Sequence, residues 1–148
     1  MFGIFSYGLP GIVLIQTINP EHYAVRFASE QNYEGFYQKE IQFRKLMRYP
    51  PFAALANVLL RSQNQEDALA MSVELGRVLD PAPEGVKVLG PAEAPVPKLK
   101  SEFRYQLLLK AADRRILNET LRNLQRFAQE QKWPATALII DVDPLTLM

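Results

Sequence analysis

The 148-residue sequence has no cysteine and a single histidine, His22. Without cysteine there is no disulfide framework and no thiolate zinc or iron–sulfur site. One histidine leaves little for imidazole metal ligation, and hydrolases of the usual histidine-dependent kind would all have to be built on it. We expect His22 to be a solvated or partly packed imidazole beside a helix N-cap. Composition alone therefore favours a binding module over an enzyme.

The sequence also lacks the glycine-rich loops that bind nucleotide phosphates. Its seven glycines form neither G-x-x-x-x-G-K-[ST] nor G-x-G-x-x-G. The net charge of +1 supports no general claim about nucleic acid or membranes. The apolar start, residues 1–15, is broken by glycine and proline and has no basic region, so it predicts neither a signal peptide nor a membrane span. We expect a cytoplasmic protein without membrane partners.

Three elements are predicted before residue 52. The apolar run Ile12–Thr17, bounded by Pro-Gly and Asn-Pro, predicts a buried strand. Asn19 is the expected N-cap of a short helix over Pro20–Ala28, with proline at its first position. Apolar and aromatic residues at helical spacing over Gln31–Met47 predict an amphipathic helix, which the following Pro50-Pro51 ends.

From about residue 52 the pattern becomes regular. The Pro-rich stretch Gly90–Lys100 is predicted as a connection that stays off the central strands. The order β-α-β-β-α-β, with two helices apolar on one side each, predicts a ferredoxin-like α+β domain: a four-stranded antiparallel sheet with both helices on one face. The expected elements are strands Leu55–Leu60, Val86–Leu89, Phe103–Leu109 and Ala135–Val142 and helices Asn64–Leu79 and Arg114–Gln131, the latter with Asp113 as N-cap.

A local excess of positive charge is the first candidate for a binding site. Residues 98–126 contain eight basic and three acidic residues. These basic side chains could contact phosphates or an acidic peptide, although a basic helical face is often merely solvated. The residues predicted to bind DNA are Lys98, Lys100, Arg104, Arg122 and Arg126.

The strand around residue 105 could instead carry an aromatic binding face. Alternation places Phe103 and Tyr105 on one side of this strand and Arg104 and Gln106 on the other. If the aromatic side were uncovered, it would favour an RNA- or ribosome-associated α+β binding domain, since such sheets often bind RNA through exposed aromatics. The sequence leaves open which side faces the helices.

One pair of carboxylates offers an enzymatic alternative. Asp141 and Asp143 lie two residues apart, so on an extended strand both would point to one face and could share a divalent cation. Such an ion takes more oxygen ligands than two, and the sequence places no others. A strand that ends in a polar turn is the simpler interpretation.

Four segments in this order carry a family resemblance, which runs from about Pro10 to the end. They resemble the C-terminal part of the PriA family of primosomal replication-restart DNA helicases, also called primosomal protein N′. The segments are PGIVLIQTINPEHYAV, NYEGFYQKEIQFRKLMRYPPF, VLGPAEAPVPKLKSEFRYQLLLKA and IIDVDPLTLM.

The resemblance implies a division of the chain into two parts. Residues 1–51 would be a remnant of the second helicase lobe with a connecting aromatic helix, and residues 52–148 the C-terminal α+β domain. The intact family is an ATP-dependent 3′ to 5′ DNA helicase, but its ATP-binding motifs and zinc-binding cysteines are missing from this sequence. ATP, magnesium and zinc would thus belong to parts not present here, and we expect neither ATPase nor helicase activity. We expect an excised fragment or a truncated gene product.

The same resemblance implies partners. It predicts a non-catalytic module that contacts branched and single-stranded DNA, the rest of the helicase and the acidic tail of single-stranded DNA-binding protein. Arg114 aligns with a family arginine that grips the terminal carboxylate of that tail, and Asn118 with a polar residue that lines the same site. We also expect self-association through residues 1–47, because the strand Ile12–Thr17 would lack its sheet partners.

Overall fold

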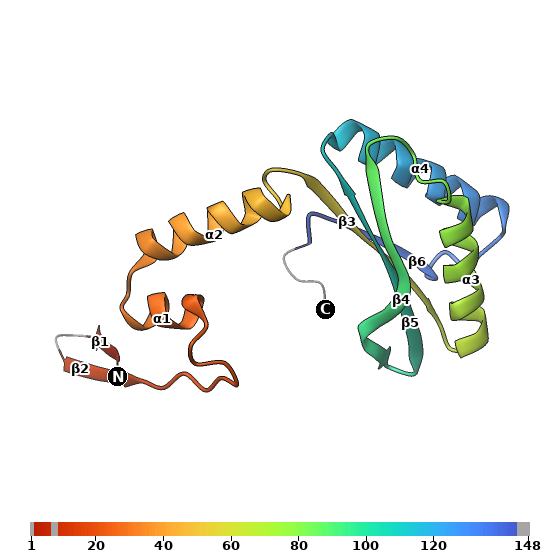
Figure 1. Ribbon diagram of the computed structural model, residues 1–148. Helices are drawn as coiled ribbons and strands as arrows, with labels where there is room; N and C mark the ends of the chain where they lie inside the picture. Colours follow the sequence, from red (N-terminus) through yellow and green to blue (C-terminus); the bar gives the residue numbers. More distant parts are fainter. Residues whose placement is uncertain (1, 7–8, 145–148) are drawn as a thin grey trace. The chain divides into compact units, whose positions relative to one another are not determined.

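The computed structural model describes residues 2–6 and 9–144 (Figure 1). It divides the chain into two compact units, Met1–Met47 and Arg48–Met148, each of which has its own architecture. Within the described residues, no helix combines the length and the apolar character that crossing a membrane requires.

The first unit contains two short strands and two helices. Strands β1 (Phe2–Ser6) and β2 (Leu9–Val13) pair in an antiparallel two-stranded sheet, and helices α1 (Tyr23–Ser29) and α2 (Tyr33–Met47) follow. The predicted buried strand over residues 12–17 is wrong, because β2 ends at Val13 and the next residue, Leu14, is 91% exposed.

The start of α1 also differs from the prediction. The helix begins at Tyr23 rather than Pro20, and His22 is its N-cap: Nδ1 of His22 accepts a hydrogen bond from the Ala24 N–H at 3.3 Å. The carbonyl of Asn19 instead accepts from the His22 N–H, so the intervening residues form a turn. The one histidine of the chain thus satisfies a free N–H group of a helix end, as a capping residue does.

The second unit confirms the predicted ferredoxin-like α+β fold. Its four strands form one antiparallel sheet in the order β4-β5-β3-β6, joined by two helices. The elements are β3 (Ala54–Ser62), α3 (Gln65–Val78), β4 (Val86–Leu99), β5 (Glu102–Ala111), α4 (Arg114–Glu130) and β6 (Leu138–Val142).

The core lies between the sheet and the two helices. Alternate residues of β3, such as Val58 and Leu60, pack with Leu107 of β5 against Leu75 of α3 and Leu117 of α4, and all five are fully buried. Because strand side chains alternate between faces, both helices cover one face of the sheet, and no helix of this unit lies on the other, here called the uncovered face. This packing holds α4 in a defined position. On the uncovered face the side chains of the central strand β3, such as Leu55 and Leu59, are nevertheless buried.

The Pro-rich stretch is part of a strand and not a connection. Strand β4 runs through Pro91, Pro95 and Pro97 to Leu99, with two irregularities in its pairing with β5. The predicted exclusion from the central strands is confirmed, since β4 lies at the edge of the sheet. An edge strand tolerates proline because its outward side needs no N–H donor.

The structure decides which side of β5 faces the helices. Tyr105 is buried and pairs with Leu60, which lies in the core. Arg104 and Gln106 therefore lie on the uncovered face of the sheet.

Candidate partner-binding site

The predicted N-cap of α4 is confirmed. Asp113 has extended backbone angles, and its Oδ1 accepts a hydrogen bond from the Arg115 N–H at 2.7 Å. Arg114 is therefore the first residue of the helix. At this end unpaired backbone N–H groups and the positive end of the helix dipole favour a negatively charged ligand.

Arg114 is exposed and ion-paired. Its side chain is 61% exposed, and Nη2 contacts the carboxylate of Asp143, just beyond the end of β6. The other carboxylate oxygen of Asp143 accepts a hydrogen bond from the Leu55 N–H at 3.0 Å. The guanidinium thus lies where β3 begins and β6 ends.

Asn118 is the second predicted partner-binding residue at this end of α4. It lies four residues after Arg114 in the same helix and is partly buried. Residues four apart lie one above the other on a helix surface. The structure therefore places both predicted partner-binding residues on one side of α4, next to its N-terminus. A guanidinium and an amide so arranged can bind a carboxylate by charge-assisted hydrogen bonds.

The five predicted DNA-binding residues fall into two groups. Lys98, Lys100 and Arg104 lie around the β4–β5 turn, where Nζ of Lys98 is 4.5 Å from the centre of the Phe103 ring. Arg122 and Arg126 are exposed on α4. Arg104 projects from the uncovered face of the sheet and α4 covers the other, so these residues do not form one continuous surface.

The uncovered face also carries a pair of lysines that the sequence alone did not indicate as a site. Lys87 of β4 lies directly opposite Lys110 of β5. Burial, and to a lesser degree the charge of Lys87, lowers the pKa of Lys110, whose Nζ is 4.0 Å from the centre of the Tyr49 ring. Strand alternation from Arg104 would have placed Lys110 on this face, but the pairing with Lys87 requires the register of the sheet.

The alternative in which Asp141 and Asp143 share a cation assumed an extended strand through both residues, and the structure differs there. Strand β6 ends at Val142, and Asp143 has a left-handed backbone with φ of 49°. Strand alternation therefore does not continue to Asp143, and its carboxylate is engaged by Arg114 and Leu55. Across residues 2–6 and 9–144, no three His, Asp or Glu side chains gather as a metal site would need.

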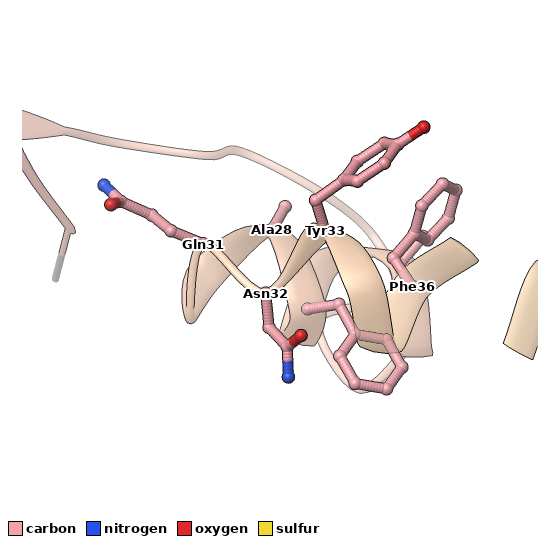
Figure 2. A pocket seen from close by; sticks show the side chains of 7 residues that line it. Ala28, Gln31, Asn32, Tyr33 and Phe36 are labelled. Atoms are coloured by element: carbon pink, nitrogen blue, oxygen red, sulfur yellow. The ribbon is translucent and has the colours of Figure 1, made fainter. Parts of the chain in front are cut away.

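An apolar hollow lies between α1 and α2. It has a volume of about 320 Å³ and an almost wholly apolar lining that includes Phe27, Tyr33 and Phe36. Figure 2 shows the rings of Tyr33 and Phe36 extending from α2. Such a lining suits an apolar side chain, and it contains no carboxylate, histidine or lysine.

Comparisons with known proteins agree on one family. The protein-family model of the primosomal protein N C-terminal domain matches residues 45–145 of this chain. The chain is 31% identical over 139 residues to replication restart protein PriA of Borreliella burgdorferi, covering 93% of this chain and 21% of the relative. For the PriA of Thermotoga maritima the identity is 36% over 145 residues, covering 98% and 18%; for that of Bacillus subtilis it is 30% over 141 residues, covering 94% and 18%.

The chain spans about a fifth of the length of these curated relatives. The family match covers well over half of the chain and includes the whole of the sheet and both helices of the second unit. By this match the chain belongs to the primosomal protein N C-terminal domain family.

Proposed function

We propose that this chain is a non-catalytic binding module of a replication-restart helicase, which contacts DNA and the acidic tail of single-stranded DNA-binding protein. Membership of the C-terminal domain family supports the role in replication restart, because the matching relatives are named replication restart proteins. The rest of such a helicase is a further proposed partner.

One observation carries the proposed tail site: an exposed arginine in the first turn of a firmly packed helix. Arg114 offers a planar guanidinium with five N–H donors, and the helix end adds backbone donors. These groups suit a carboxylate at the end of a peptide, which can bind a guanidinium through two parallel hydrogen bonds. Asn118, one turn on, supplies an amide to the same site.

The proposed DNA contacts are electrostatic. Lys98, Lys100, Arg122 and Arg126 are exposed and Arg104 is partly exposed. Such side chains bind phosphates without reading the base sequence. Because the β4–β5 turn and α4 do not form one continuous basic surface, two arms of a branched DNA would contact them separately.

The observation that would have favoured an RNA-binding domain is not found in the described sheet. Tyr105 is buried under the helices and not displayed on the uncovered face. On that face β5 carries Arg104, Gln106, Leu108 and Lys110, and none of these side chains has an aromatic ring for stacking.

The tail site is tested by replacing Arg114. We expect Arg114→Ala to weaken binding of a labelled acidic tail peptide by about 1.5–3 kcal/mol, the usual contribution of a charge-assisted hydrogen bond. Fluorescence anisotropy with the full chain measures this change.

The matched control is Arg126→Ala, which removes the same charge from another exposed position of α4. It should change the affinity by less than a factor of two. Equal losses from both substitutions would show diffuse charge attraction instead of a site at Arg114. No binding by the unmodified chain would refute the proposed tail site.

A further inference from the structure

Arg114 already has a carboxylate partner within the chain. Its Nη2 contacts Oδ2 of Asp143, which lies 29 residues further along the sequence. The proposed tail ligand would bring a second carboxylate to the same guanidinium. The structure therefore raises the question of what Asp143 does when that ligand arrives.

The position of Asp143 is fixed by the sheet and is not that of a mobile surface residue. Its N–H donates to the Leu55 carbonyl at 2.7 Å, and its Oδ1 accepts from the Leu55 N–H at 3.0 Å. The backbone takes the left-handed conformation that aspartate and asparagine tolerate better than most residues. These bonds place Oδ2 on the side where Arg114 reaches it.

The ion pair is also open to exchange. The side chain of Arg114 is 61% exposed and that of Asp143 is 26% exposed. Ion pairs near the surface contribute little, because water screens the charges and two side chains must be held in one geometry. A ligand carboxylate can therefore compete for the guanidinium, and two carboxylates next to each other repel.

We propose that Asp143 is an intramolecular competitor: it occupies Arg114 in the free chain, and the terminal carboxylate of a peptide binds by displacing it. This inference rests on the proposed tail site and assigns to that site a residue that limits its affinity. When the peptide carboxylate replaces that of Asp143, Arg114 has one ion pair both before and after binding. Tail binding by the unmodified chain should then depend weakly on salt.

The test is Asp143→Asn in the full chain. Asparagine keeps an oxygen that can accept the Leu55 N–H and tolerates the left-handed backbone, but it loses the charge that holds Arg114. We expect the labelled acidic tail peptide with a free C-terminal carboxylate to bind about two- to fivefold more tightly. The upper figure corresponds to about 1 kcal/mol, the most that an exposed ion pair usually contributes.

Three controls separate competition from a general change in charge. Asp141→Asn removes the same charge two residues away, from a carboxylate on the uncovered face of the sheet, and should leave the affinity within a factor of 1.5. When Arg114→Ala is also present, Asp143→Asn should give no gain in affinity, because the ion pair between Arg114 and Asp143 is already absent. The same peptide with an amidated C-terminus should show no gain.

The outcomes distinguish this inference from the proposed tail site. If Arg114→Ala weakens binding and Asp143→Asn leaves it equal or weaker, the tail site stands and the competitor role of Asp143 is overturned. An equal gain from Asp141→Asn would also overturn it. If the unmodified chain does not bind the peptide, both proposals fail.

Discussion

At the scale of single residues, Glu40 links the two helices of the first unit. It lies on α2 and accepts hydrogen bonds from the hydroxyl of Tyr23 on α1 and, at 2.7 Å, from Nε of Arg44. The bond from Tyr23 is the main cause of a lowered pKa at Glu40, and that from Arg44 adds to it. The same bond to Glu40 is the main cause of a raised pKa at Tyr23.

This contact predicts a pH window for the α1–α2 packing. A lowered pKa at Glu40 means that its contribution is present above the usual glutamate pKa of about 4.3 and is lost as the pH falls through the folded value. A raised pKa at Tyr23 means that its contribution is present below about pH 10 and is lost as the pH rises through the folded value. Amide hydrogen exchange of α1 at several pH values measures both losses.

Tyr23→Phe isolates the bond. We expect the pKa of Glu40, measured by NMR of its carboxyl carbon, to move up toward the usual glutamate range. Tyr33→Phe is the matched control, because Tyr33 stacks on Tyr37 and is mostly exposed. The same titration of Glu40 in both variants would contradict the role of Tyr23.

Residues of the candidate site differ in how far the sequence predicts them. Asp113 is predictable, because an aspartate directly before a helical pattern is a local N-cap signal. The pairing of Arg114 with Asp143 is not, since it depends on where β6 ends and on the left-handed turn at Asp143. Family resemblance pointed to Arg114 and Asn118 but contained no information about the internal carboxylate.

At the scale of elements, the sequence predicts the helices and strands whose apolar side chains pack against other elements of the same unit. The patterns of α3 and α4 each give one apolar face, and both helices use the expected faces in the core. Strand β4 is longer than predicted because prolines, which argue against a central strand, are compatible with an edge. In the first unit, the apolar pattern predicts burial of the residues after Val13, but Leu14 and Ile15 are exposed.

The basic residues of the β4–β5 turn and of α4 lead to a prediction about DNA binding. For about three to five phosphate contacts, a log-log plot of affinity against salt should have a slope of roughly −2 to −4. Lys98→Ala with Lys100→Ala, and separately Arg122→Ala with Arg126→Ala, should each weaken binding and make the slope shallower by about 1 to 2.

A third double variant controls for the loss of two positive charges. Lys39→Ala with Lys45→Ala removes two exposed lysines from α2 and should leave the slope unchanged within about 0.5. Filter binding or anisotropy over a salt series gives the slopes. An affinity that does not change between low and physiological salt would contradict the electrostatic basis, and equal changes in all three variants would contradict the assignment to the β4–β5 turn and α4.

At the scale of the whole molecule, the two units differ in how they bury apolar surface. The second unit has a continuous core between sheet and helices. In the first, no residue of α1 or α2, both described throughout, is fully buried. An unpaired strand, which the sequence analysis expects over Ile12–Thr17, does not explain this difference, because β2 pairs with β1. The exposed apolar side chains of this unit include Leu14, Ile18, Tyr33, Phe43 and Leu46.

Self-association through residues 1–47 therefore stays a prediction, now based on exposed side chains. Association with another chain would remove apolar surface of these side chains from water, which is favourable. Leu46 of α2 is 81% exposed, so Leu46→Glu should lower the weight-average mass at high protein concentration without affecting the core. Leu69→Glu is the matched control, because Leu69 is an exposed leucine, at 45%, on a helix of the second unit.

Light scattering and sedimentation over a concentration series distinguish the possible results. We expect the unmodified chain and Leu69→Glu to associate with the same concentration dependence and Leu46→Glu to associate less, because a charge at the centre of an apolar contact must lose its hydration. A monomer at the highest concentration for the unmodified chain would refute self-association. Equal weakening by both leucine substitutions would place the contact outside the first unit, and the exposed face of α2 would then need another explanation.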